Sequence, residues 1–323
     1  MFCKGSLQKQ GARWSRQIHE TCLRANRKLA VLRSVKFLKR NTLSLLYKVC
    51  VRSTVEYGLV LYWNNLKQTE AARIRQIQYR GARIVTGALP FTSQSKLESD
   101  LALETFDERY RFLGLTIFHK IHLGLTRPLI RTCMPQINTN NTRGAGCYIL
   151  PKFTRLSFKY SFFPFFSVLW SKLSKSTKNE RDILLFKDNL RLLYKPKKQK
   201  HFNYGDKWAN TLLCRLRVGR SFLKSHGFQI NLSNTDRCLC GEEDHTQSFF
   251  LSCFLFQQER KEMLEKVQTI LPNFLKQSKK RQCDILLFGI NLDSPYPDPR
   301  NKFLTFIVQK YILKTNRFSK HYD

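Results

Sequence analysis

The chain has 323 residues, of which 42% are hydrophobic and 25 are Phe, which is ample material for buried cores and excludes a largely disordered chain. Lys and Arg number 57 against 23 Asp and Glu, so the formal net charge is +34 and we expect a polyanionic partner. No apolar run approaches the roughly 20 residues that a membrane span needs, and the N-terminus lacks the apolar core of a secretory signal. We therefore expect a protein of the nucleus or cytoplasm that is not secreted and has no membrane partner.

The charge is distributed unevenly. Residues 1–90 carry 18 basic and 3 acidic side chains, and residues 91–231 carry 25 and 9. Residues 232–301 are nearly neutral, with 9 basic and 10 acidic side chains. Because polyanions bind where positive charge is clustered, the binding surface is expected in the first 231 residues, with the basic tail as a further contributor.

The first 125 residues predict a helical region. Segments with apolar residues at helical spacing, which indicate helices, are 12–35, 42–63, 69–85, 93–101 and 104–123. The residues expected on one side of the second segment are Leu46, Val49, Ser53 and Tyr57. In the third segment Ile74, Ile77 and Ile84 predict an apolar stripe, and a different face carries Arg73, Gln76, Arg80 and Arg83.

Residues 126–204 differ in composition. Gly, Asn, Thr and Pro accumulate, which indicates a loop-rich linker region with a short strand near 147–150 and short helices near 167–173 and 181–193. The run KPKKQK at 195–200 contains a Pro that a helix interior excludes, so it predicts a basic hinge. His119 and His122, which precede this region, are three residues apart on a predicted helix with no third ligand nearby, and we interpret them as buried or capping histidines.

Residues 205–323 predict a C-terminal helical domain. Helices are expected over 208–224, 254–270 and 301–317. In the first of these, Arg217, Arg220 and Lys224 would share a face. The fold class predicted for the whole chain is mainly α: a helical bundle over 1–125, a loop-rich linker with little β-structure over 126–204, and a small helical domain.

Three of the ten cysteines cluster within this last domain. Cys238, Cys240 and Cys253 lie within sixteen residues with His245 between them, and three thiolates and an imidazole suffice for a tetrahedral zinc shell. The Cys-x-Cys pair is tighter than the usual ligand spacing, so three buried thiols are an equal alternative. Cys283 could replace His245 as the fourth ligand. The cofactor expected at this segment is structural zinc.

Basic side chains at helical spacing form the second candidate site. The residues expected to contact nucleic-acid phosphates are Arg73, Arg80, Arg83, Arg215, Arg217, Arg220 and Lys224. The alternative is an ordinary solvated face, but no acidic residues interleave at i,i+4 to offset the repulsion. No catalytic residues are predicted, because neither Asp107-Glu108 nor the tract at 242–244 follows the apolar strand on which a two-metal polymerase holds its carboxylates.

Two stretches resemble a known family. They are LSLLYKVCVRSTVEYGLVLYWN (43–64) with IRQIQYRGARIVTGAL (74–89), and LLCRLRVGRSFLKSHG (212–227) with CLCGEEDHTQSFFLSC (238–253). The first is similar to the helical region that follows the palm in reverse transcriptases of non-LTR retrotransposons, jockey-like elements in particular. The second resembles the short Cys/His segment near the end of the same polyproteins. Together the two stretches span most of the chain, in the expected order.

The resemblance implies a thumb-like region that grips a template–primer duplex, then a linker, then a zinc-binding tail. Arg73, Arg80 and Arg83 would then face nucleic acid, and Cys238, Cys240 and Cys253 would ligate zinc. The family has His five positions before its last Cys, where this chain has Ser248. The fingers and palm, with their paired aspartates, would lie upstream of residue 1, so the chain is expected to be inactive as a polymerase by itself.

The sequence therefore predicts a nucleic-acid-binding C-terminal portion of an RNA-directed DNA polymerase. Its expected partners are RNA, DNA or an RNA–DNA hybrid, together with a polymerase palm supplied by another chain. The alternative is a non-functional or domesticated relic that acts, if at all, as a protein-binding scaffold.

Overall fold

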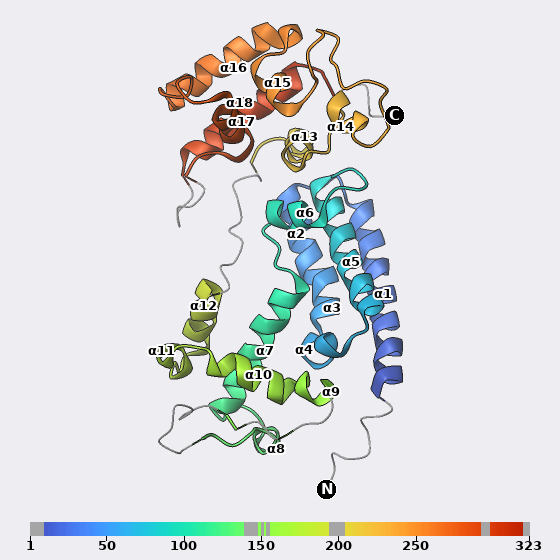
Figure 1. The fold of residues 1–323 in the computed structure, drawn as a ribbon, viewed down its shortest axis with the longest axis vertical. Helices are drawn as coiled ribbons and strands as arrows, with labels where there is room; N and C mark the ends of the chain where they lie inside the picture. Colours follow the sequence, from blue (N-terminus) through green and yellow to red (C-terminus); the bar gives the residue numbers. More distant parts are fainter. Residues whose placement is uncertain are drawn as a thin grey trace. The chain divides into compact units, whose positions relative to one another are not determined.

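The fold of the chain is mainly α-helical, as the sequence predicts (Figure 1). The structure, a computed structural model, describes residues 10–138, 148–149, 152, 156–193, 204–291 and 298–318. Within these residues the β-structure consists of two isolated antiparallel bridges, one between Ile137 and Tyr148 and one between Arg237 and Glu243. None of the helices described is both long enough and apolar enough to span a bilayer. The predicted basic hinge at 195–200 lies outside the described residues.

The described residues form two compact units. Unit 1 takes its residues from 1–30, 48–78 and 103–197, and unit 2 from 31–47, 79–102 and 198–323. The division falls inside two long helices, α1 (Gln10–Ser34) and α5 (Gln68–Thr86), which carry residues of both units. Each unit buries apolar side chains of its own.

Unit 1 is organised around helix α7 (Phe106–His122). Thr105 and Glu108 begin this helix with a reciprocal capping box, which satisfies two backbone N–H groups that the first turn leaves without partners. Helices α10 and α12 both pack against α7. The other helices of the unit are α3 (Ser53–Glu56), α4 (Leu59–Tyr62), α8 (Pro128–Arg131), α9 (Leu156–Lys159), α10 (Phe162–Ser171), α11 (Lys175–Lys178) and α12 (Ile183–Leu193).

His119 is a buried structural residue of this core, as the sequence indicates. Its Nε2 lies 2.7 Å from the carbonyl oxygen of Glu180, and its ring stacks on Phe186 with centroids 3.7 Å apart. The indole N–H of Trp170 donates to Nδ1, so Nε2 carries the proton of a neutral imidazole. Burial lowers the pKa of both His119 and His122, which keeps these rings uncharged inside an aromatic cluster.

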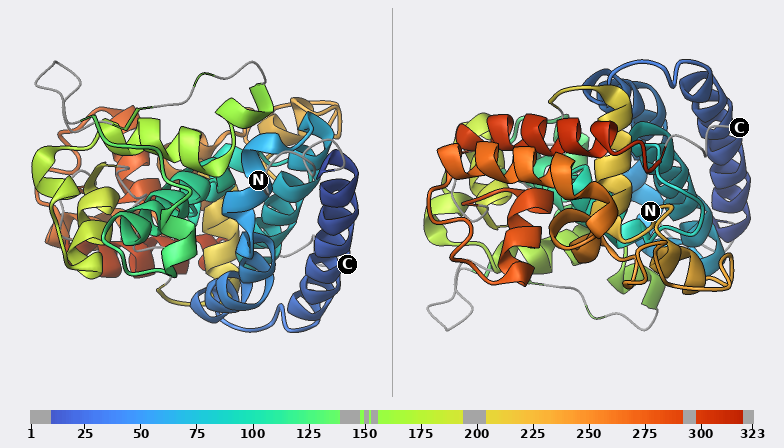
Figure 2. Two further views of the ribbon diagram at one scale, coloured as in Figure 1. Left: turned by 90° about the horizontal axis from the view of Figure 1, so that it is seen from below. Right: turned by 90° about the horizontal axis from the view of Figure 1, so that it is seen from above.

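Unit 2 contains a second core built mainly from five helices. Helices α16 and α18 run side by side, in orange and red in Figure 2, and α13 packs against both α17 and α18. Asp206 caps the start of α13 by accepting a hydrogen bond from the N–H of Ala209. The helices of the unit are α2 (Arg40–Leu46), α6 (Gln94–Asp100), α13 (Lys207–Val218), α14 (Lys224–Phe228), α15 (Thr246–Leu251), α16 (Gln257–Ile270), α17 (Lys279–Phe288) and α18 (Arg300–Lys314).

The helix predicted over 42–63 is interrupted. A π-helical segment, Tyr47–Arg52, follows α2, and Gly58 in the left-handed region separates α3 from α4. Of the residues expected on one side, Val49, Ser53 and Tyr57 are exposed, and the buried side is formed by Tyr47, Val51 and Val55. Because a π turn places more residues in each turn than an α turn, the buried positions recur at intervals of four.

The helix predicted over 208–224 is shorter than expected. It ends at Val218 because Gly219 adopts φ 71°, the left-handed C-terminal cap that glycine favours. Arg220 and Lys224 therefore do not share a helical face with Arg217. The predicted strand at 147–150 is represented, within the described residues, by the single bridge at Tyr148.

Candidate nucleic-acid interface and metal centre

Four cations of unit 2 line a single groove. Its volume is about 450 Å³, and the residues that line it are Arg33, Lys36, Arg80, Arg83, Ile84, Gly87 and Ala88. We call this the basic groove. Arg33 lies at the end of α1, and Lys36 follows that helix. The remaining lining residues come from the last two turns of α5 and from the two residues after it. None of the described residues that line the groove is acidic. Its described lining therefore carries positive charge alone, as a phosphate-binding surface requires.

Helix α5 presents the cations of the basic groove because of a close contact on its opposite side. Gly81 lies between Arg80 and Arg83 in sequence, and the ring of Tyr47 packs directly on its backbone: a Cβ built at Gly81 would lie 2.2 Å from that ring. Ile74 and Ile77 are buried as predicted, whereas Ile84 lies in the groove beside the two arginines.

The seven basic residues predicted to contact phosphates separate into three groups. Arg80 and Arg83 line the basic groove, and the sequence reasoning missed Arg33 and Lys36 beside them. Arg220 and Lys224 line a different cavity of unit 2. Arg73, Arg215 and Arg217 line neither. Arg73 is exposed on the part of α5 that belongs to unit 1.

Arg217 has a structural role in place of the predicted phosphate contact. Its side chain is 1% exposed, and its Nε donates to Asp100 Oδ1 at 2.7 Å. The same carboxylate accepts from Arg40, so one acidic group joins α2, α6 and α13. Burial opposes ionisation of Asp100, but the two guanidinium groups outweigh it and hold its pKa well below the usual range. Arg217 is therefore excluded from the candidate interface.

Arg215 is also held within unit 2. Its Nε donates to the carbonyl oxygen of Gly87 at 3.0 Å, and its guanidinium lies over the rings of Trp208 and Phe222, 5.3 Å from each centroid. These contacts fix the Gly87 turn, which itself lines the basic groove. Arg215 thus supports the shape of the groove from behind, and does not line it.

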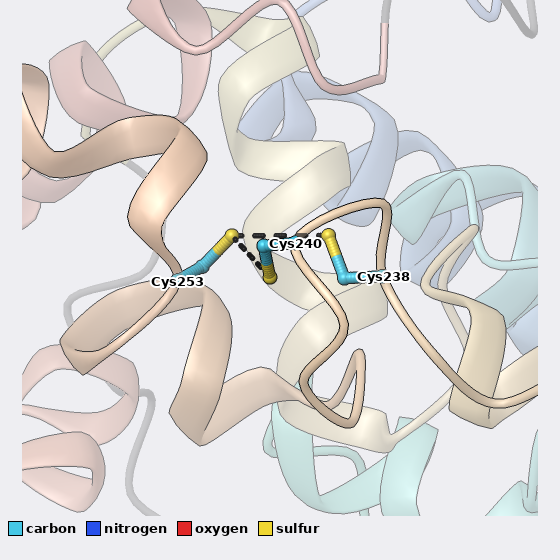
Figure 3. Close-up of side chains that lie close together, drawn as sticks. All are labelled: Cys238, Cys240 and Cys253. Carbon is cyan, nitrogen blue, oxygen red and sulfur yellow. Dashed lines mark hydrogen bonds between the residues drawn. The ribbon is translucent and has the colours of Figure 1, made fainter.

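The cysteine cluster is built from a tight turn and the end of a helix. Gly241 adopts φ 87°, and its N–H donates to the carbonyl oxygen of Cys238, which closes a turn that carries Cys238 and Cys240. Cys253 follows α15, where its N–H donates to Ser248 and its carbonyl oxygen accepts from Arg260. The turn and the helix end thereby bring all three thiols together (Figure 3).

The spacing of the three thiols fits a tetrahedral metal. The Sγ of Cys253 lies 3.8 Å from that of Cys238 and 3.6 Å from that of Cys240, and all three are free thiols. A zinc–sulfur bond of about 2.3 Å in tetrahedral geometry separates two sulfurs by about 3.8 Å. Two of the three sulfur separations thus match a tetrahedral zinc site, and all three sulfurs lie within 4.8 Å of one another.

Neither proposed fourth ligand joins this cluster. The only group of three or more metal-ligand side chains found among the described residues consists of the three cysteines. His245 Nδ1 lies 3.1 Å from the carbonyl oxygen of Glu243 and 3.0 Å from Ser248 Oγ, at the start of α15. Cys283 is buried in the apolar core of unit 2. A zinc ion bound here would have three protein ligands from the described residues and one further position for water or another donor.

Cys240 and Cys253 differ in how readily they ionise. Burial opposes ionisation of Cys240, but hydrogen bonds to the backbone at Glu242 and to the neighbouring thiols together outweigh it and lower the pKa of this thiol. Burial raises the pKa of Cys253 to about 12. A bound divalent cation would favour the thiolate form of these cysteines, including Cys253, because thiolates are the species that bind metal and binding releases their protons.

Comparison of the chain with protein-family models, with curated proteins and with solved structures found no match.

Proposed function

We propose that this chain binds nucleic acid through the basic groove, as the C-terminal portion of a retrotransposon reverse transcriptase that grips the backbone of a template–primer duplex. The observation that carries the proposal is the convergence of Arg33, Lys36, Arg80 and Arg83 on one groove whose described lining contains no acidic residue. Contacts to backbone phosphates hold a nucleic acid independently of its base sequence, which suits a protein that must move along its template.

The whole-chain charge agrees with this function. A formal net charge of +34 attracts polyanions at long range, and the groove provides a place where that attraction becomes contact. The resemblance of residues 43–89 to the region after the polymerase palm supports the same function. Catalysis would come from a polymerase palm, while the residues described here hold the duplex.

The cysteine cluster is proposed as a structural zinc site of the same protein. Its place in the sequence matches the resemblance to the Cys/His segment, and its sulfur spacing matches zinc. Bound zinc would join the turn at Cys238 to the end of α15 and so stabilise unit 2.

Salt dependence of binding tests the role of the groove. Each phosphate neutralised on duplex DNA contributes about −0.9 to the slope of log K against log salt, so four cations predict a slope of about −4 between about 50 and 200 mM salt. The double variant Arg80→Gln with Arg83→Gln is expected to reduce the magnitude of this slope by about 2. Fluorescence anisotropy of a labelled RNA–DNA hybrid and of a DNA duplex measures both quantities.

The matched control removes two cations elsewhere. Lys279 and Lys280 are exposed at the start of α17 and do not line the groove. Lys279→Gln with Lys280→Gln changes the net charge equally and should leave the slope nearly unchanged. If both double variants lowered the affinity equally, binding would depend on total charge and the groove would have no special part.

A further inference from the structure

Unit 2 contains a second cavity whose chemistry differs from that of the basic groove. It has a volume of about 600 Å³, which lies within the range of about 300–1,000 Å³ typical of small-ligand sites. The loop after α5 and the segment from Arg220 to Ser233 form most of it. The apolar residues among those that line it are Leu89, Pro90, Phe91, Phe222, Leu223, Ile230 and Leu232.

Phe91 is held in an unusual conformation at this cavity. It adopts φ 60°, in the left-handed region that side chains other than glycine and asparagine rarely enter, and its side chain is 83% exposed. Because the ring of Phe91 is exposed to water, burial of this side chain contributes little stability that could offset the strain of its backbone. Strain of this kind is found at ligand-binding positions, where the surrounding structure over-determines it.

Three cations accompany the apolar surface. Arg220, Lys224 and Arg317 line the same cavity, and none of the lining residues that the structure describes is acidic. Asp244, which accepts hydrogen bonds from the N–H of Lys224 and from Arg317, offsets part of this charge from behind. Arg317 Nε is buried and has no hydrogen-bond partner. The cavity therefore combines an exposed aromatic face and an apolar wall with an excess of positive charge.

We propose that this cavity takes a single unpaired nucleotide, with its base against Phe91 and its phosphate near Arg220 and Lys224. A stacked base pair cannot enter a concave pocket, whereas an unpaired base presents a face that aromatic side chains stack upon. The inference deepens the proposed function, because the nucleotide would belong to a strand held by the same unit. The same chemistry is offered by a free nucleotide.

The test separates contact with the base from contact with phosphate. Its probes are a labelled oligothymidylate strand, the same strand with abasic positions in place of the bases, and an RNA–DNA hybrid duplex. The full chain should bind the strand with bases about tenfold more tightly than the abasic strand, as expected for one stacked base. Phe91→Ala should remove this difference and leave the affinities for the abasic strand and the duplex unchanged.

Two further variants test whether the preference for bases depends on this cavity. Phe303→Ala removes another exposed Phe of unit 2 that does not line the cavity, and it should preserve the tenfold preference. Arg220→Gln should weaken binding of both single strands, since it removes a phosphate contact. Thymidine monophosphate provides the last arm: competition with the strand shows that the pocket also accepts free nucleotides, and its absence restricts the pocket to strands.

The outcomes distinguish the pocket from the groove. If duplex binds with the expected salt dependence but bases add no affinity, or Phe91→Ala retains the preference, the pocket inference is overturned and the proposed function stands. If strands and duplex fail to bind but thymidine monophosphate binds and Phe91→Ala abolishes that binding, the proposed function is overturned and the pocket inference stands. Binding of none of the probes would overturn both.

Discussion

At the scale of single residues, the cysteine cluster shows how local backbone geometry selects ligands from a list of candidates. The sequence predicts His245 as the fourth ligand, with Cys283 as the alternative. The structure turns His245 towards Glu243 and Ser248 and places Cys283 in the apolar core. Which side chains meet is decided by the Gly241 turn and by the end of α15, and neither is visible as a spacing rule.

The first prediction concerns zinc content. The purified chain should hold one zinc ion, and Cys238→Ser or Cys253→Ser should abolish it, because each removes one of three thiolates. A chelator should lower the melting temperature of the wild-type chain and have no effect on these variants. Elemental analysis and thermal melts followed by circular dichroism provide the measurements.

Two controls define the ligand set. Cys50→Ser changes an exposed cysteine outside the cluster and should leave the zinc content intact. His245→Ala should do the same, since this imidazole hydrogen bonds elsewhere. Loss of zinc from His245→Ala would instead show that His245 rotates to bind the metal. A wild-type chain without zinc would show that the cluster is three free thiols, two of them buried.

At the scale of elements, the Asp100 carboxylate is the point that joins α2, α6 and α13. Removal of its charge leaves Arg40 and Arg217 buried without compensation, so Asp100→Asn should lower the free energy of unfolding by about 3–5 kcal/mol. The control is Asp107→Asn, which breaks a half-exposed pair with Arg75 and should cost less than about 1 kcal/mol. Urea denaturation measures both, and equal losses would refute the assignment.

The ion pairs of Asp100 with Arg40 and Arg217 also predict that the folded chain loses stability in acid. The pKa of Asp100 is held below its ordinary value in the folded chain and returns to about 3.9 on unfolding. Its contribution is therefore fully present above about pH 4 and is lost as the pH falls below that value. Asp100→Asn should lack this part of the acid destabilisation.

Element prediction from sequence succeeded where caps and periodicity agree, and failed where the backbone departs from α geometry. Helices α5 and α7 lie within one or two residues of their predicted limits, because both carry a continuous apolar stripe and Thr105 caps the second. Between residues 47 and 52 the π-helical segment shifts the phase, so a stripe counted at 3.6 residues per turn selects the exposed side. Arg217 was misplaced because nothing local identifies Asp100 as its partner.

At the scale of the whole molecule, the net charge of +34 should oppose folding and assist binding. Added salt screens the self-repulsion of the folded chain, so the melting temperature should rise by several degrees from low to moderate ionic strength. Over the same range the affinity for nucleic acid should fall steeply. Thermal melts and anisotropy on one set of buffers compare the two trends, and a melting temperature that falls with salt would contradict the expectation.

The binding surfaces were the part of the molecule least accessible to sequence reasoning. Arg80 and Arg83 could be found because they recur on one face of a helix. Arg33 and Lys36 also lie three residues apart, but only the fold brings them opposite α5. The second cavity of unit 2, which we propose to hold a nucleotide, offers no comparable pattern in the sequence. Two of its lining residues, Phe91 and Lys224, are separated by more than a hundred residues.

The π-helical segment at Tyr47–Arg52 gives this stretch a place where the length of the chain can change. Because a π turn holds about one residue more than an α turn, loss of one residue there would let the segment relax to ordinary α-helix and leave the residues that follow on their present sides. Inside a regular helix such as α7, each residue removed turns all that follows by about 100° around the helix axis. In a gene that is copied with errors, a missing codon in the π-helical segment should therefore survive more often than a missing codon within α7.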